Sequence, residues 1–571
     1  MCEDGADERY GVAQPSIKMK PTRVLLLITL AVGLALTLAR WGTGGTSSAA
    51  VIPQSASPES RPVVLASPHQ EEPKPDVLLV VIDTLRADRL GAYGYTRGLT
   101  PVMDELARKG SVFRRASSQA AWTLPSMCSL VTSQYPTGPN HFPHPGRTTL
   151  AEAFQAAGYA TVGVVANDLL DPLFTIDVPN PPNPNERFGG FERGFDAYVP
   201  RTGPDDKRRG PAHFDAVASW AEEALQAAVT PDENGLRKPL FFYIHPIDPH
   251  TPYHGKQRML ADQPVGTVPP ILPEGWQLQQ LMERGPSAPA DDPHWEKALH
   301  TMQRVRNAYD HEVRTADEAL GRLLDHLRDL GVGDNLIVAI VSDHGEELFE
   351  NVLLGKPEEL RDMDPRAFFF QTHGYSLYEQ ELRTPFILSG PGITQGRVFD
   401  EPVENVDLFP TLVSLCGLKR PEDPHGVDLT TLMEGRADPE QWRSLTYSWV
   451  EQAISVRDEA RGLKLVLPTP FGMERNLLAP QLFDLHADPL ERVNLWPSRR
   501  EDGQRLASEI IAYLERYKAR PYLLTGEALE RLRKRLAAMG YADAAIGLPS
   551  DGEPEAAKMK RMLLERGYLQ E

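Results

Sequence analysis

Two acidic residues come directly after apolar runs of strand length. The first run, residues 77–82, ends on Asp83, and the second, residues 336–342, ends on Asp343 with His344 next to it. Continuous apolar runs are typical of strands buried on both faces of a parallel sheet, and ligands bind at the carboxyl ends of such strands. A single acid there is commonly a helix N-cap, whereas two acids and a histidine favour a metal site. Mixed Asp and His ligation suits zinc, manganese or iron better than an all-oxygen calcium site.

A hydroxyl that could act as a nucleophile lies between these acids in the sequence. Residues 122–132 (WTLPSMCSLVT) predict a loop that turns into a helix, with Pro125 at the first helical position and Thr123 just before it. The N-terminus of a helix stabilises an anion, and a metal-bound hydroxyl there can be deprotonated and attack sulfur or phosphorus. The alternative is that Thr123 only caps the helix.

The rest of the chain must supply the elements that position these residues. Apolar residues of 310–330 fall on one helical face, so a helix precedes the strand at 336–342, as in an α/β crossover unit. Two further apolar runs, 160–166 and 239–245, fit the same sheet. We therefore expect an α/β fold, with Asn167 following another strand at the same edge as the two acids.

Composition excludes several classes of protein. The chain has 571 residues and a formal net charge of −19, so we expect no nucleic-acid partner. The 41% hydrophobic and 24% charged fractions argue against wholesale disorder. Cys2, Cys128 and Cys416 are too few and too far apart for a disulfide scaffold or a cysteine zinc site.

The long uncharged apolar run of the sequence covers residues 24–39 (VLLLITLAVGLALTLA). Basic residues precede it, which predicts a cytoplasmic tail over 1–23 and an exported catalytic domain, periplasmic or extracellular. The segment 24–40 is short for a bilayer span and long for a signal core, and no A-x-A site follows it, so we favour an uncleaved transmembrane anchor over a signal. Residues 41–75 are rich in Gly, Ser, Ala and Pro and predict a flexible linker.

A series of motifs between residues 76 and 500 occurs in the order found in one family. They include DVLLVVIDTLRADRLGAYGY (76–95), WTLPSMCSLVTSQYP (122–136), FFYIHPIDPHTPY (241–253), VSDHGEEL (341–348), HGYSLYEQELRTPFILSGPG (373–392) and LFDLHADPLERVNL (482–495). The chain resembles the sulfatase family of the alkaline-phosphatase-like superfamily. This resemblance implies a catalytic domain over 76–420, whose mixed, mostly parallel central sheet is flanked by helices. It also implies a smaller C-terminal α+β subdomain over 421–505. Amphipathic spacing predicts a helical tail over 506–571, and the charged, mixed composition after Gly547 predicts a solvated appendage at its end.

The site residues of the family carry over position by position. By resemblance, Asp83, Asp343 and His344 are metal ligands, and Thr123 is the metal-bound nucleophile. Family members normally have Cys or Ser at the nucleophile position, in a C/S-x-P-x-R signature from which formylglycine is made. Because this chain has threonine there, and Met127 at the arginine position, we expect no formylglycine.

Further positions match or depart from the family pattern. Thr84 stands where sulfatases usually have a second acid. His250 matches a residue that contacts the substrate or its leaving group, and His373 is expected to be a further ligand or acid. Asn140 and His141 match substrate-binding residues. The expected cofactor is one or two divalent ions, zinc, manganese or calcium.

The resemblance implies a metal-dependent hydrolase of sulfate, phosphate or phosphonate esters, acting on a small-molecule, glycan or lipid ester. Asp, Thr, Asp and His around one metal is the set of superfamily members with a threonine nucleophile, such as phosphodiesterases and phosphoethanolamine transferases. Two alternatives stay open: a membrane-anchored phosphoethanolamine-type transferase and a catalytically silent sulfatase-like binding protein. The presence of all three metal-ligand residues argues against the silent protein.

Overall fold

The computed structural model describes residues 73–136, 142–144, 146–172, 190–201, 213–250, 253, 293–348, 373–439, 441–474, 478–517, 534 and 554–570. The chain divides into two compact units, Met1–Glu71 and Glu72–Glu571. The first unit lies outside the described residues, and with it the predicted cytoplasmic tail, the membrane segment and nearly all of the linker. Among the helices that are described, none has the length and apolarity needed to cross a bilayer.

The described chain contains both strands and helices along its length. The strands are β1 (Asp76–Val81), β2 (Ser111–Ser117), β3 (Ala160–Val165), β4 (Ala197–Pro200), β5 (Leu240–His245), β6 (Leu336–Val341), β7 (Phe386–Ser389), β8 (Arg397–Glu404), β9 (Leu445–Val450), β10 (Ala453–Asp458), β11 (Leu463–Pro468) and β12 (Gln481–Asp484). The α-helices are α2 (Pro101–Lys109), α3 (Thr123–Thr132), α4 (Leu150–Ala156), α5 (Phe214–Trp220), α6 (Glu222–Val229), α8 (Pro293–Asp329), α10 (Glu379–Leu382), α11 (Leu408–Leu415), α12 (Thr430–Met433), α13 (Pro470–Glu474), α14 (Arg500–Arg516) and α16 (Glu555–Glu565). Short 3-10 helices lie between them: η2 (Ala87–Arg89), η3 (Gly91–Tyr93), η4 (Asp168–Leu170) and η9 (Asn405–Asp407). The strands predicted from apolar runs are β1, β3, β5 and β6.

The larger sheet has eight strands in the order β4-β3-β5-β1-β6-β7-β2-β8. Neighbouring strands are parallel, except that β7 pairs antiparallel with β6 and β2. β1 lies between β5 and β6, with Val80 beside Ile244 on one side and Ile340 on the other. The predicted mixed, mostly parallel sheet is confirmed.

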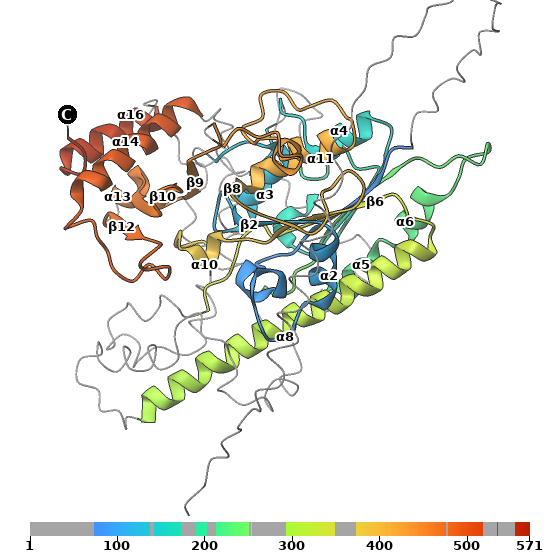
Figure 1. Ribbon diagram of the computed structural model, residues 1–571, viewed down its shortest axis with the longest axis horizontal. Coiled ribbons are helices and arrows are strands. Elements are labelled where there is room, and N and C mark those ends of the chain that lie inside the picture. The colour runs from blue at the N-terminus through green and yellow to red at the C-terminus, as the bar shows by residue number, and fades with distance from the viewer. Residues whose placement is uncertain are drawn as a thin grey trace, which may run out of the picture. The chain divides into compact units, whose positions relative to one another are not determined.

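Helices cover both faces of this sheet (Figure 1). Val77, Leu79 and Val81 of β1 belong to one apolar core, to which α3, α4 and α11 contribute. Leu78 and Val80 belong to a second core, shared with α2, α5, α6 and α8. Because both faces are buried, β1 is a continuous apolar run rather than an alternating one.

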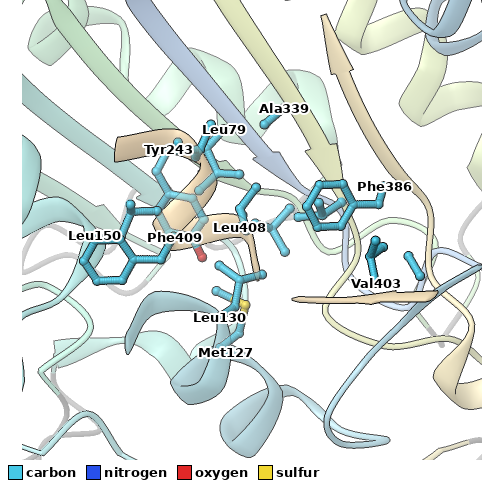
Figure 2. Packing of buried hydrophobic residues seen from close by; sticks show 14 of the residues in the cluster. Leu79, Met127, Leu130, Leu150, Tyr243, Ala339, Phe386, Val403, Leu408 and Phe409 are labelled. Carbon is cyan, nitrogen blue, oxygen red and sulfur yellow. The ribbon is translucent and has the colours of Figure 1, made fainter. Parts of the chain in front are cut away.

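The first core fixes the helix that begins at the nucleophile position. Figure 2 shows Met127 and Leu130 of α3 close to Leu408 of α11, in the same cluster as Leu79 of β1. Met127 is fully buried there, so the position at which the resemblance expects an arginine is part of the apolar packing. Apolar packing of this kind stabilises a helix more than intrinsic propensity does.

A second sheet, four-stranded and antiparallel in the order β12-β11-β10-β9, forms the smaller C-terminal part. α14 and α16 complete its core, with Leu506, Met559 and Leu563 buried against the strands. The predicted solvated appendage is therefore wrong for residues 554–570, because the apolar residues of α16 fall on one helical face and are buried, although charged residues alternate with them in the sequence. The predicted boundary at residue 505 falls inside α14.

Candidate active site

Four neighbouring strands carry polar side chains at one edge of the larger sheet. In the order β3-β5-β1-β6, these are Asn167 after β3, His245 at the end of β5, Asp83 after β1 and Asp343 after β6. All four side chains are buried. Because parallel strands end at the same edge, the fold brings together groups that are up to 260 residues apart in sequence.

Asp83 has one carboxylate oxygen engaged and one without a partner. Its Oδ2 accepts hydrogen bonds from Asn167 Nδ2 at 2.6 Å and from His245 Nε2 at 3.3 Å. The ring of His245 is held in turn by the Tyr243 hydroxyl, 3.0 Å from Nδ1. No described residue bonds to Asp83 Oδ1. Burial opposes ionisation, but the bond from His245 and the charge of nearby His250 hold the pKa of Asp83 below its usual range.

Asp343 also has one carboxylate oxygen that is hydrogen-bonded and one that is not. Oδ1 accepts the backbone N–H groups of Thr84 at 3.2 Å and His344 at 2.9 Å, whereas Oδ2 has no partner in the described part of the chain. Burial and the charge of Asp83 raise the pKa of Asp343. His344 Nδ1 donates to the Gly345 carbonyl at 2.8 Å, which leaves the lone pair on Nε2. Burial lowers the pKa of His344 and so favours the neutral form that binds metals.

The unengaged atoms converge on one point. His344 Nε2 lies 3.4 Å from Asp343 Oδ2 and 3.8 Å from Asp83 Oδ1, and the three ligand atoms lie within 4.8 Å of one another. Tetrahedral ligands bound at about 2.0–2.2 Å are about 3.3–3.6 Å apart. Two buried carboxylate oxygens without a partner are costly unless a cation binds them. These residues therefore fit a divalent metal ion.

Thr123 lies at the start of α3 beside these groups. Its Oγ1 is 3.4 Å from His344 Nε2 and accepts a hydrogen bond from Asn167 Nδ2 at 3.2 Å. The prediction that Pro125 begins the helix is wrong: α3 begins at Thr123, and Pro125 is its third residue, where a missing N–H breaks no helical bond. The Ser126 hydroxyl donates to a backbone carbonyl just after β6 and so fastens the helix to the metal-ligand loop.

Two more of the predicted residues lie near this site. The ring of His373 is centred 4.7 Å from that of His344 and 4.9 Å from that of His250. His373 Nδ1 lies 2.8 Å from Glu346 Oε1, and this buried carboxylate orients the ring. Outside the described residues lie the two predicted substrate-binding residues, Asn140 and His141.

Sequence reasoning placed Asn167 at a strand end but assigned it no role. In the structure its Oδ1 accepts the Leu169 N–H at 2.9 Å, which orients Nδ2 toward Asp83 and Thr123. Glu346 was also missed, although it follows the metal-ligand motif by two residues. The signal for Asn167 is the one that identified Asp83, a polar residue two positions after a buried strand.

Comparison with known proteins identifies the family. The family model described as Sulfatase matches residues 75–418, which is more than half of the chain and includes Asp83, Thr123, Asp343 and His344. This chain belongs to the sulfatase family. A second model, N-sulphoglucosamine sulphohydrolase, C-terminal, matches residues 372–519 of this sulfatase-family protein.

The matches to individual relatives span most of this chain and most of each relative. The Ulvan-active sulfatase of Formosa agariphila is 26% identical over 486 residues, 80% of this chain and 85% of the relative. The multifunctional alkaline phosphatase superfamily protein PehA of Trinickia caryophylli is 25% identical over 497 residues, 74% of this chain and 91% of the relative.

The solved structures support the same fold. The phosphonate monoester hydrolase of Agrobacterium radiobacter has a TM-score of 0.56 at 20% identity, covering 78% of this chain and 96% of that one. Membership of the sulfatase family makes this protein an ester hydrolase. Hydrolases of this family use a divalent metal, for which the chain provides a fitting group of ligands in Asp83, Asp343 and His344.

Proposed function

We propose that this sulfatase-family protein is a metal-dependent hydrolase of sulfate, phosphate or phosphonate esters in which the Thr123 hydroxyl is the nucleophile. One observation carries the proposal. Thr123 Oγ1 lies 3.4 Å from His344 Nε2, in the buried site where Asp83 and Asp343 each have a carboxylate oxygen without a partner among the described residues. A hydroxyl, two acids and an imidazole in this arrangement have the chemistry of a metal-activated nucleophile.

The residues of the site divide the reaction between them. Asp83, Asp343 and His344 would hold a divalent ion, which supplies positive charge to the ester oxygens and lowers the pKa of the Thr123 hydroxyl. The Thr123 oxygen attacks sulfur or phosphorus in line, and the bond to the leaving alcohol breaks as the new bond forms. Asn167 Nδ2 donates to the Thr123 oxygen and stabilises its negative charge. Water then hydrolyses the Thr123 ester.

The leaving alcohol needs a proton, and the two histidines near His344 are suited to give it. His373 is oriented by the bond to Glu346, and its ring lies edge-on to that of His250. We propose that one of these two histidines protonates the leaving oxygen as it departs. The same group would then take a proton from the water that hydrolyses the Thr123 ester.

An unmodified threonine nucleophile accords with the surroundings of residue 123. Formylglycine is made from Cys or Ser in a C/S-x-P-x-R signature, and this chain has Thr123 and Met127 at the two key positions. Met127 is buried in the apolar core beneath the sheet, so no cation comes from that position. The names of the relatives include both sulfatase and phosphonate monoester hydrolase, which supports a test of sulfur and phosphorus esters side by side.

The decisive experiment is a substrate panel assayed with the purified full chain. An aryl sulfate, a bis-aryl phosphate diester and an aryl phosphonate monoester are each assayed after chelation and after addition of zinc, manganese or calcium. We expect turnover of at least one ester, its loss on chelation and its recovery with one of the metals. A protein that binds no metal and hydrolyses none of the esters would overturn the proposal.

His373→Gln is expected to slow hydrolysis most for esters with poor leaving groups. General acid catalysis contributes about 10²–10⁴-fold when the leaving group needs the proton, and little when it is a stable nitrophenolate. The measurement compares kcat for alkyl and 4-nitrophenyl esters of the same acid. Equal losses for both leaving groups would show that His373 serves only to position other groups, and the same pair of substrates then tests His250→Gln.

Asn167→Asp is expected to lower kcat by about 10²–10³-fold, the usual effect of removing a donor to a reacting oxygen. The aspartate retains an oxygen that accepts the Leu169 N–H, so the turn after β3 is preserved. It removes the N–H that donates to Thr123 and adds negative charge beside Asp83. Asn167→Ala removes the same donor without adding a negative charge, so comparing the two variants separates the loss of the hydrogen bond from the effect of the charge. Wild-type kcat in both variants would contradict the role given to Asn167.

A further inference from the structure

The residue after the first metal ligand has an unusual backbone conformation. Thr84 has a φ of 56°, in the left-handed region. The other non-glycine residues with positive φ in the described chain are Ser133, Asp423 and Glu491, none of which is β-branched. A β-branched residue is disfavoured in this region because its Cβ substituents crowd the backbone, and such strain concentrates at functional sites.

Backbone contacts on both sides hold Thr84 in this conformation. Its N–H donates to Asp343 Oδ1 at 3.2 Å, and its carbonyl accepts a hydrogen bond from the Tyr309 hydroxyl at 2.7 Å. The next N–H along, that of Leu85, donates to Ser342 Oγ at 2.9 Å. None of these bonds involves the Thr84 side chain, so a glycine would make the same contacts with less strain.

The Thr84 hydroxyl forms no hydrogen bond with the described residues in this conformation. The side chain is fully buried, and Oγ1 has no hydrogen-bond partner among the described residues. A buried hydroxyl without a partner costs stability, because it has lost its bonds to water. Thr84 directly follows Asp83 in the sequence, and its backbone N–H bonds to Asp343. The unsatisfied hydroxyl therefore belongs to a residue that is attached to both acids of the site, each of which has an unsatisfied oxygen of its own.

We propose that the Thr84 hydroxyl is a ligand-contacting group of the active site, which donates a hydrogen bond to an oxygen that occupies the site during turnover. This inference rests on the proposed function and deepens it. In either case the acceptor is an oxygen atom. It belongs either to the sulfate, phosphate or phosphonate group, as a non-bridging oxygen, or to a water molecule held in the site. A neutral donor at this position replaces the acid that sulfatases usually have, and it assists an anionic substrate instead of repelling it.

The test compares variants that change the hydroxyl and the backbone strain separately. Thr84→Val keeps the shape and the strain and removes the donor, so kcat/KM is expected to fall about 10–100-fold, the usual effect of losing a hydrogen bond to a charged oxygen. Its melting temperature without ligand is expected to be equal to or above that of the wild type, because an unsatisfied hydroxyl has been removed. Thr84→Ser, which keeps the donor, is expected to recover most of the activity.

Thr84→Gly adds a second, independent readout. It removes the hydroxyl and relaxes the left-handed backbone, so it is expected to lose activity like the valine variant and to melt at a higher temperature than that variant. If instead Thr84→Val melts at a clearly lower temperature and keeps wild-type kcat/KM, the hydroxyl has a structural partner and the proposal is wrong.

Binding measurements distinguish the two sources of the oxygen. Inorganic sulfate and phosphate are titrated into the metal-loaded wild type and Thr84→Val, and metal affinity is measured by competition with a chelator. About tenfold weaker anion binding with unchanged metal affinity assigns the hydroxyl to the substrate oxygen, whereas weaker metal retention alone assigns it to water. Unchanged values of both overturn the proposal. Because these titrations need no turnover, they stand even if no ester in the substrate panel is hydrolysed.

Discussion

Thr123→Ala is expected to lower the turnover of every ester substrate by at least about 10³-fold, the scale seen when a covalent nucleophile is removed. The alanine removes the oxygen that lies 3.4 Å from His344 Nε2 and leaves Asp83, Asp343 and His344 in place. Metal content measured by plasma emission spectroscopy is therefore expected to stay near that of the wild type, while steady-state kinetics show the loss. A variant that retains more than a tenth of the wild-type kcat would exclude Thr123 as the nucleophile.

Thr123→Ser is the matched control for this result. It retains a hydroxyl at the first residue of α3, within reach of the Asn167 N–H, and is expected to keep measurable activity. Intact-protein mass then shows whether the serine has been converted to formylglycine, which we do not expect, because Met127 stands at the arginine position of the signature. On the wild type, rapid quenching with a slow substrate is expected to trap a sulfated or phosphorylated peptide that contains Thr123.

Asp343→Asn is expected to remove metal binding and to lower turnover at least about 10²-fold. Replacing a residue that only hydrogen-bonds to a metal ligand costs about 10–100-fold, and replacing a ligand itself is expected to cost more. The same variant is expected to raise the melting temperature of the metal-free protein. Asp343 Oδ2 is buried without a partner among the described residues and lies beside a second carboxylate, so its charge destabilises the fold when no cation is present. Differential scanning calorimetry with and without metal measures both effects.

The pH dependence of this stabilisation has a definite sign. Burial and the charge of Asp83 raise the pKa of Asp343 in the folded state above its unfolded value, so ionised Asp343 costs stability at pH values above the raised pKa. The advantage of Asp343→Asn over the metal-free wild type is therefore expected to shrink as the pH falls through that pKa. A variant that is less stable than the metal-free wild type at neutral pH would contradict this account.

Asp407 offers a matched control, because it is also a fully buried aspartate whose pKa burial raises. Unlike Asp343, it forms an ion pair with Arg443, and its Oδ1 also accepts the Val427 N–H at 2.8 Å. Asp407→Asn leaves the partly buried guanidinium of Arg443 with less compensation and is expected to lower the melting temperature. Opposite shifts of the melting temperature for the two substitutions would show that the charge of Asp407 stabilises the fold, whereas the charge of Asp343 destabilises it and serves to bind a ligand.

The strands that carry the metal ligands could be predicted because a strand buried on both faces has a continuous apolar sequence. β1 and β6 contain no polar residue between their first and last positions, and Asp83 and Asp343 each lie two positions after the last residue of their strand. Side-chain type then restricts the chemistry, since two acids and an imidazole at strand ends suit few roles besides binding a cation. The start of α3 could not be predicted, because the burial of Met127 and the bond from Ser126 outweigh the preference of Pro125 for the first helical position.

The sequence by itself determined which residues are available for chemistry and at which strand ends they stand. Only the tertiary structure decided how each is used, because the order of the strands places β5 and β6 on either side of β1. That order brings His245 and Asn167 to one oxygen of Asp83 and leaves the other to converge with Asp343 and His344. The strained backbone and the unsatisfied hydroxyl of Thr84 arise in the same way. They depend on hydrogen bonds between Thr84 and residues more than 200 positions away, which no local pattern can encode.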